Sequence, residues 1–212
     1  MISYFKNINA KKSLVFIVAL ILIDQIIKFY IKLNFPLTTY GQPPIIDLGF
    51  FKLLFIENKG MAMGARLNNI IPFLSDDAAK LILTIFRIFA CIGLAFWLKS
   101  LFNKKNSSFL IFCISLIIAG AIGNLIDSIF YGVIFSSSLG QVASLFPETG
   151  YSSLFYGSVV DMIQFPLATW VWPNWMPFVG GQEYTFFEYV FNFADSYIST
   201  GVLLLLIFNK KI

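Results

Sequence analysis

The chain has 212 residues, of which 58% are hydrophobic and only 12% are charged, and its formal net charge is +4. Polar groups cannot cover so much apolar side-chain area in a soluble domain of this size, so the composition indicates an integral membrane protein. The cations form no basic interaction surface in the sequence, and no nucleic-acid partner is expected.

Four apolar segments are long enough to cross a bilayer, whose hydrocarbon core of about 30 Å requires roughly 20 helical residues. They are predicted at about residues 13–33, 78–98, 109–127 and 189–208. Two long segments, residues 34–77 and 128–188, are expected outside the membrane. The predicted fold is mainly α, a polytopic membrane protein that forms one domain over residues 1–212, because the chain contains no internal repeat.

The first predicted span follows a basic start, as a secretory signal peptide does, but no small-residue cleavage motif follows its apolar run. Asp24 and Gln25 follow instead, so the segment is expected to be retained as a span. Lys28 and Lys32 lie near its outer end and are interpreted as cations that extend towards the headgroups.

Residues 45–56 of the first outer segment are rich in β-branched and aromatic side chains, which predicts strands and a small sheet at the membrane surface. This stretch is followed by Asn58 and by Gly60, which is interpreted as a turn or close-approach residue. In the second span, Arg87 is expected to pair with a carboxylate or to face the helix bundle. Cys91 and Cys113 are interpreted as packing residues.

The third span ends with Asn124 and Asp127, which lie one helical turn apart on one face. Two interpretations of Asp127 remain open, an acid at a helix end in the interface and a group that supports a site. The second outer segment carries Asp161 and then a region rich in tryptophan and proline, predicted to be an irregular loop at the headgroup level. The fourth span repeats the same spacing with Asn192 and Asp195.

The lysines predict the orientation, because basic residues in short flanking segments stay on the cytoplasmic side. They flank the spans at Lys6, Lys11, Lys12, Lys99, Lys104, Lys105, Lys210 and Lys211. Both termini are therefore expected in the cytoplasm and both long segments outside. With this orientation, the polar residues of three spans lie at a similar depth near the outer face.

An acid inside a membrane is costly and indicates a functional site. The sequence contains no histidine, which excludes Ser-His and Cys-His nucleophile systems and His-ligated zinc. Two aspartates in a site of low dielectric tend to share one proton, so one can activate water while the other polarises a carbonyl. The expected chemistry is that of an aspartic protease, without metal or cofactor.

The chain resembles the lipoprotein signal peptidases, also called signal peptidase II, of bacterial inner membranes. Five motifs occur in the order of that family: Asp24-Gln25-Ile26-Ile27-Lys28, Asn58-Lys59-Gly60-Met61-Ala62-Met63-Gly64, Gly123-Asn124-Leu125-Ile126-Asp127, Val159-Val160-Asp161 and Phe191-Asn192-Phe193-Ala194-Asp195-Ser196.

The resemblance implies that Asp161 and Asp195 are the catalytic dyad of an endopeptidase that cuts prolipoproteins before a diacylglyceryl-modified cysteine. It implies four membrane helices, a small extracytoplasmic sheet and a surface helix, in a protein that contacts membrane lipids and is expected to be a monomer. The residues expected to bind substrate or support the site are Asp24, Lys28, Asn58, Gly60, Asn124, Asp127 and Asn192.

The chain departs from the family pattern at three points. Ser128 stands where an arginine is usual, Met63 replaces a usual phenylalanine, and the interval between Asp161 and Asp195 is longer than is common. Two rival functions are a proton- or cation-coupled transporter and a scaffold protein. The sequence shows no inverted repeat, which disfavours a transporter, and a scaffold would not require Asn-x-x-Asp on two helices.

Overall fold

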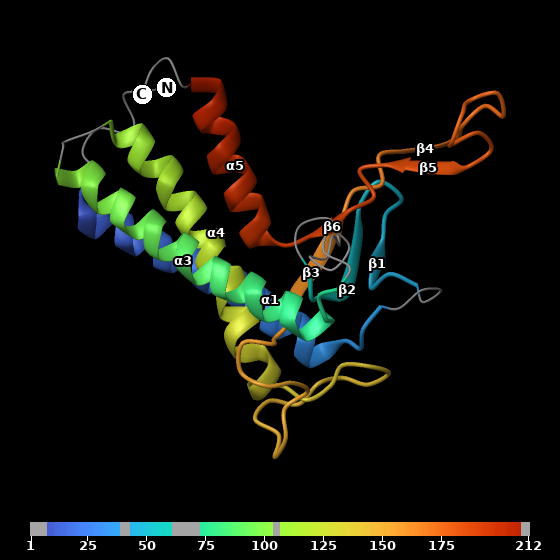
Figure 1. Ribbon diagram of the computed structural model, residues 1–212, viewed down its shortest axis with the longest axis horizontal. Helices are drawn as coiled ribbons and strands as arrows, with labels where there is room; N and C mark the ends of the chain where they lie inside the picture. Colours follow the sequence, from blue (N-terminus) through green and yellow to red (C-terminus); the bar gives the residue numbers. More distant parts are fainter. Residues whose placement is uncertain (1–7, 39–42, 61–72, 104–106, 209–212) are drawn as a thin grey trace.

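The structure is a computed structural model that describes residues 8–38, 43–60, 73–103 and 107–208. In these residues four helices form a bundle, and a small sheet lies beyond one end of it (Figure 1). The helices are α1 (Ala10–Asn34), α3 (Asp76–Asn103), α4 (Ser108–Ile134) and α5 (Phe193–Phe208). The strands are β1 (Ile46–Asp47), β2 (Lys52–Asn58), β3 (Val159–Gln164), β4 (Ala168–Val171), β5 (Glu183–Phe186) and β6 (Val190–Phe191).

Helices α1, α3 and α4 are long and apolar enough to cross a membrane, with mean hydropathies of 2.3, 2.3 and 2.5. The first two contain the predicted spans. Helix α4 does not end at Asp127 as expected but continues to Ile134, because its last turns pack against the sheet. Helix α5 is a shorter apolar helix of 16 residues. Residues 189–192, predicted as the start of the fourth span, instead lead through β6 to the start of α5.

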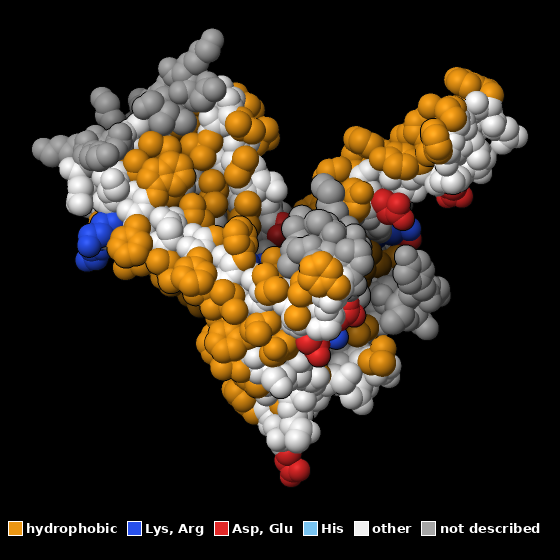
Figure 2. All heavy atoms as spheres, in the orientation of Figure 1, with side chains coloured by type: hydrophobic (Ala, Val, Ile, Leu, Met, Phe, Trp, Pro, Cys, Tyr) orange, Lys and Arg blue, Asp and Glu red, His pale blue; other side chains and the backbone are white. Residues whose placement is uncertain are grey.

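Helix α4 contacts each of the other three helices and supplies most of the buried bundle surface. Small residues make its closest contacts possible. A Cβ atom at Gly120 would overlap the backbone oxygen of Ala194, so only glycine lets α4 and α5 approach this closely. The exposed faces of the helices carry apolar side chains, which are seen on the bundle surface in Figure 2.

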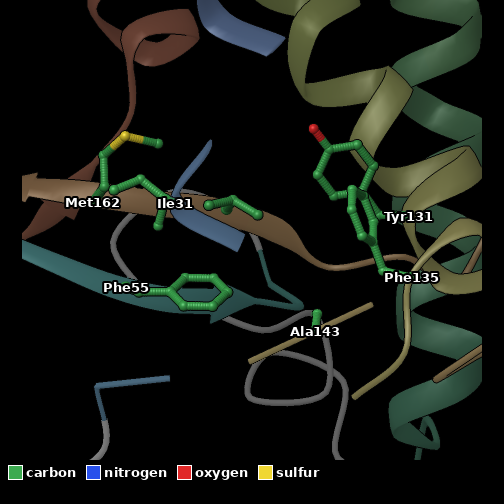
Figure 3. Packing of buried hydrophobic residues seen from close by; sticks show 7 residues of the cluster. Ile31, Phe55, Tyr131, Phe135, Ala143 and Met162 are labelled. Atoms are coloured by element: carbon green, nitrogen blue, oxygen red, sulfur yellow. The ribbon is translucent and has the colours of Figure 1, made fainter. Parts of the chain in front are cut away.

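The main sheet has the strand order β1-β2-β3-β6, and each neighbouring pair is antiparallel. The strands predicted within residues 45–56 are confirmed as β1 and most of β2. A hydrophobic cluster joins this sheet to the C-terminal ends of α1 and α4 (Figure 3). Its buried members are Ile31, Phe55, Tyr131, Phe135, Ala143, Val160 and Met162.

Lys32 does not extend to the headgroups, and that prediction is wrong. Its side chain is fully buried, pairs with Glu57 of β2 and donates a 2.9 Å hydrogen bond to Ser138 Oγ. Its Nζ atom also lies 4.7 Å from the centroid of the Tyr151 ring. The sheet and the segment after α4 cover the end of α1, which leaves this lysine no path to water.

The tryptophan-rich region is not an irregular loop, because β4 and β5 pair as an antiparallel hairpin. Hydropathy and proline content alone did not predict this pairing. The described residues contain no separate surface helix. Residues 61–72, which include Met63, Gly64 and part of the second motif, lie outside the described part of the chain.

Candidate active site

Asp195 lies in the first turn of α5 and is held there by a reciprocal pair of hydrogen bonds with Asn192. The backbone N–H of Asp195 donates to Asn192 Oδ1 at 2.9 Å, and the backbone N–H of Asn192 donates to Asp195 Oδ2 at 3.2 Å. This is a capping-box arrangement, which satisfies N–H groups that a helix start would otherwise leave unpaired. The positive end of the helix dipole also favours a carboxylate at this position.

Asp161 lies in the middle of β3 and points to the face opposite the hydrophobic cluster. Since side chains alternate along a strand, Val160 and Met162 enter that cluster while Asp161 faces the helices. A register shift between Leu53 and Ile56 of β2 lies directly across from this part of β3. Such bulges re-aim side chains next to functional sites.

Asn192 connects the two carboxyl groups. Its Nδ2 atom donates to Asp161 Oδ1 at 2.7 Å, while its backbone holds Asp195. Asn124 of α4 completes the link, because its Nδ2 atom lies 2.8 Å from Asp195 Oδ1 and its Oδ1 atom accepts from Asn192 at 3.1 Å. Asn58 at the end of β2 donates to Asp161 Oδ2 at 3.0 Å.

The environments of the two aspartates differ. Asp161 is only 4% exposed, whereas Asp195 is partly exposed. Burial raises the pKa of the Asp161 carboxyl to about 7; the negative charge of Asp195 also raises it, and the hydrogen bonds from Asn58 and Asn192 oppose the shift. A carboxyl group with this pKa is available as a proton donor near neutral pH.

A buried ion cluster lies beside the two aspartates. Lys28 is 0% exposed, and its Nζ atom lies 2.9 Å from Asp24 Oδ2, 2.8 Å from Asp127 Oδ2 and 2.9 Å from Asn124 Oδ1. The prediction that Lys28 extends to the headgroups is therefore wrong. Asp127 is also fully buried and lies inside α4, which contradicts its interpretation as a helix-end acid at the interface.

The two acids of this cluster bind the main chain near the dyad candidates. Asp24 Oδ1 accepts from the backbone N–H of Ala194 at 3.0 Å, and Asp127 Oδ2 accepts from that of Val160 at 3.3 Å. Ala194 and Val160 immediately precede Asp195 and Asp161 in the sequence. The cluster thus fixes the start of α5 and the middle of β3 relative to α1 and α4.

Sequence reasoning assigned no role to Gln25, which the structure places in this network. Its Nε2 atom donates to Asp127 Oδ1 at 2.9 Å, and its Oε1 atom accepts from the Tyr131 hydroxyl at 3.0 Å. Its position directly after Asp24 could have identified it, since a second polar residue inside a span also requires a hydrogen-bond partner.

Arg87, which had no assigned partner, reaches from α3 to the same site. Its Nη1 atom donates to Ser128 Oγ at 2.6 Å, and its Nη2 atom donates to the Gly60 carbonyl at 3.3 Å. Ser128 Oγ in turn donates to the backbone carbonyl of Asn124 at 2.9 Å. The guanidinium group therefore lies beside Ser128, the position where the resembled family usually carries an arginine.

A pocket of about 710 Å³ adjoins Asp161 and Asp195. Arg87, Asn58 and Asn124 also line it. The apolar part of the wall comes from α3, α4, α5 and the segment before α5, through Phe86, Ala90, Ala121, Ile198, Phe187 and Tyr189. Among the residues that the structure describes, no three His, Cys, Asp or Glu side chains gather as a set of metal ligands.

Comparisons with known proteins agree on one family. The profile of the family described as Signal peptidase (SPase) II matches residues 16–210. A lipoprotein signal peptidase from Porphyromonas gingivalis is 48% identical over 194 residues, which cover 90% of this chain and 79% of the relative. A lipoprotein signal peptidase from Amoebophilus asiaticus is 36% identical over 188 residues, covering 88% of this chain and 72% of the relative.

A solved structure described as a bacterial membrane enzyme has the same fold. Its TM-score is 0.56 at 24% sequence identity, and the alignment covers 95% of this chain and 89% of that chain. A second structure with the same description, covering 93% of this chain and 92% of its own, has a TM-score of 0.55 at 22% identity.

Replacing Lys28 by methionine should strongly destabilise the protein, because Asp24 and Asp127 would remain buried without their cation. Breaking a buried ion pair in this way costs about 3–5 kcal/mol. The exposed pair of Lys52 and Asp47, at 3.2 Å, provides the control. Lys52→Met should change the unfolding free energy by less than about 1 kcal/mol. Thermal unfolding in detergent would measure both, and equal shifts would contradict the assignment.

Proposed function

The chain belongs to the signal peptidase II family of aspartic peptidases and cleaves the signal peptides of prolipoproteins, and we propose that Asp161 and Asp195 are its catalytic dyad. It is a multi-pass protein of the bacterial cytoplasmic membrane. Membership of a peptidase family sets aside the transporter and scaffold alternatives. The observation that carries the proposal is that Asn192 contacts both carboxyl groups, which line a largely apolar pocket.

The two carboxyl groups have different roles in catalysis, which follow from their different environments. Asp161 carries the shared proton and donates it to the oxygen of the scissile carbonyl, while ionised Asp195 takes a proton from the attacking water. The water oxygen bonds to the carbonyl carbon and forms a tetrahedral intermediate. Asp195 then gives its proton to the leaving nitrogen, the C–N bond breaks, and Asp161 regains its proton as the new carboxyl product forms.

Asn124, Asn192 and Asn58 support this chemistry as neutral donors. They hold both carboxylates in place through the hydrogen bonds described above, without adding another charge to an apolar site. The buried ion cluster supports the dyad indirectly. Asp24 and Asp127, paired with Lys28, accept hydrogen bonds from the backbone N–H groups next to the two aspartates. Gly60 contributes through its carbonyl group, which accepts from Arg87.

The pocket supports a substrate with a diacylglyceryl-modified cysteine. Phe86 on α3 and Ile198 on α5 give the pocket apolar walls within the bundle, and such walls favour acyl chains because contact between apolar surfaces removes them from water. Such a substrate enters from the bilayer between these two helices.

Helix α5 is the proposed fourth crossing of the membrane. Its 16 residues span about 24 Å, slightly less than the hydrocarbon core, with flanking residues completing the crossing. The ring of Phe208 at its end packs edge-to-face against that of Phe109 at the start of α4, with ring centroids 5.5 Å apart. The starts of α1 and α4 and the ends of α3 and α5 share one end of the bundle (Figure 1). Together with the flanking lysines, this supports cytoplasmic termini and a site towards the outer face.

Arg87 is proposed as a positioning residue that takes the place of the arginine usual at position 128. It reaches Ser128 from a different helix, and it interacts electrostatically with Asp195 and Asp161. Its positive charge therefore lies close enough to the two aspartates to affect the charge balance of the site.

Replacing either dyad candidate tests the proposed function directly. Asp161→Asn and Asp195→Asn should each lower cleavage of a diacylglyceryl-modified peptide by roughly 10²–10⁴-fold or more, because each removes a proton-transfer group. Asp47→Asn, at an exposed surface acid, should leave cleavage unchanged. Cleavage would be measured with purified protein in detergent, and near-normal activity in either dyad variant would refute the assignment.

The rate of cleavage should fall as pH rises through about 7, because Asp161 must be protonated to donate and burial raises its pKa to about 7. Asn58→Leu removes a hydrogen bond that stabilises ionised Asp161, so the pKa should rise and the alkaline loss of activity should move to higher pH. A pH profile of kcat would measure the shift. Movement to lower pH would contradict the assignment of the proton to Asp161.

Arg87→Ala should lower kcat by roughly 10–100-fold, since charge-assisted hydrogen bonds contribute about 1.5–3 kcal/mol. Arg87→Lys should restore little, because lysine cannot donate through a planar fork. Adding Ser128→Arg to Arg87→Ala should recover part of the lost rate by supplying the charge from α4. If the double variant folds but its kcat is no higher than that of Arg87→Ala, the two positions are not equivalent.

A further inference from the structure

Residues 166–187 form an extension that the proposed chemistry does not use, and we call it the hairpin arm. Strands β4 and β5 pair in register, with Trp170 opposite Tyr184 and Thr169 opposite Thr185. The arm projects sideways from the sheet, away from the helix bundle, on the side where α5 begins (Figure 1). The described part of the bundle therefore does not cover it.

The two faces of the arm differ in chemistry. Because side chains alternate along each strand, Trp170 and Tyr184 share one face, and their ring centroids lie 4.9 Å apart. Trp172 extends this aromatic cluster, with its centroid 5.5 Å from that of Trp170. On the other face the hydroxyl groups of Thr169 and Thr185 are hydrogen-bonded at 3.1 Å. The arm is thus an amphipathic ribbon.

The tip of the arm presents two large apolar side chains, with Trp175 80% exposed and Phe178 98% exposed. The tip is an ordered turn, because the backbone N–H of Met176 donates to the Pro173 carbonyl and that of Gly180 donates to the Met176 carbonyl, both at 3.0 Å. Phe178 has a φ of +70°, a conformation that favours glycine and is strained for phenylalanine. The tip therefore holds a large apolar ring in the open although its backbone conformation would suit glycine better.

Composition and position identify the surface that this arm contacts. Residues 166–187 contain one charged residue, Glu183, and three of the four tryptophans of the chain. Tryptophan and tyrosine prefer the headgroup level of a bilayer, where the ring is apolar and the polar atom remains wet. Apolar side chains are gathered along the arm in Figure 2, as they are on the bundle. In Figure 1 the arm extends across the general direction of the helices, as an element in the plane of the membrane would.

We propose that the hairpin arm is a membrane anchor that lies in the interfacial region of the leaflet on the sheet side of the bilayer. Its aromatic face and tip contact lipid, and its threonine face is turned to water. The last residue of the arm, Phe187, lines the pocket together with Tyr189 and Val190 of the segment that follows. Anchoring the arm therefore holds this wall of the pocket at the level of the lipids. This last consequence rests on the proposed function, whereas the anchoring itself does not.

Tryptophan fluorescence in proteoliposomes tests the anchor. Trp97→Phe leaves only the three tryptophans of the arm, and a triple Phe variant of Trp170, Trp172 and Trp175 leaves only Trp97, which is 46% exposed on apolar helix α3. Lipids brominated near the glycerol end of the acyl chain should quench the arm fluorescence strongly, and aqueous iodide should quench it weakly. Strong quenching by iodide without quenching by brominated lipid would overturn the proposal. Quenching by neither reagent would also overturn it, because the arm would then be covered by protein.

Phe178→Gly provides a second test, because glycine adopts the same backbone conformation without strain and removes only the ring. In the Trp97→Phe background, this change should reduce quenching by brominated lipid about twofold or more. It should also raise KM for a bilayer-embedded lipopeptide several-fold and leave kcat unchanged.

Leu139→Ser is the control, since Leu139 is 69% exposed in a loop outside the arm. It should change neither quenching nor KM. Unchanged quenching in Phe178→Gly would overturn the role of the tip. Reduced quenching with an unchanged KM would support the anchor but refute its link to substrate entry. If the unmodified enzyme itself cleaved no lipopeptide, the proposed function would be refuted and the anchor would not.

Discussion

The structure of the site depends on the hydrogen bonds of one residue, Asn192. Its backbone and side chain bind Asp195 at the start of α5, and its side-chain amide binds Asp161 on β3. A helix start and a strand are thereby joined at the point where two acids meet. Because the amide is neutral, it holds both carboxyl groups without deciding by its own charge which of them is ionised. The burial of Asp161 raises the pKa of its carboxyl group, and for that reason we place the proton on Asp161.

The buried ion cluster around Lys28 provides the frame for this arrangement. Charges removed from water must be paired and hydrogen-bonded, and the cluster meets this requirement with two carboxylates, an amide and two backbone N–H groups. Its partners lie on α1 and α4 and on the backbone of β3 and α5. Such a cluster adds little to stability compared with well-packed apolar residues, but it specifies one relative position of the four elements. The hydrophobic cluster around Phe55 supports the same position from the opposite face of β3.

The sequence predicted the features that local composition determines. Hydropathy located the three long spans, β-branched residues located β1 and β2, and the spacing of Asn124, Asp127, Asn192 and Asp195 identified the polar faces. The features set by tertiary contacts were not predictable in this way. Helix α4 continues beyond its predicted end at Asp127 because the sheet covers its last turns. Helix α5 begins only at Phe193 because residues 190–191 pair with β3. Lys28 and Lys32 are buried because distant segments supply Asp127 and Glu57 as partners, and Arg87 contacts Ser128 on another helix.

The central claim is that Asp161 and Asp195 share one proton, held on Asp161. Infrared difference spectroscopy of the protein in lipid, recorded as pH is raised, tests it most directly because protonated and ionised carboxyl groups absorb at different frequencies. The account predicts that a protonated carboxyl signal disappears around pH 7 and is absent from Asp161→Asn. A signal that persists unchanged in Asp161→Asn, or no carboxyl titration near pH 7, would contradict it.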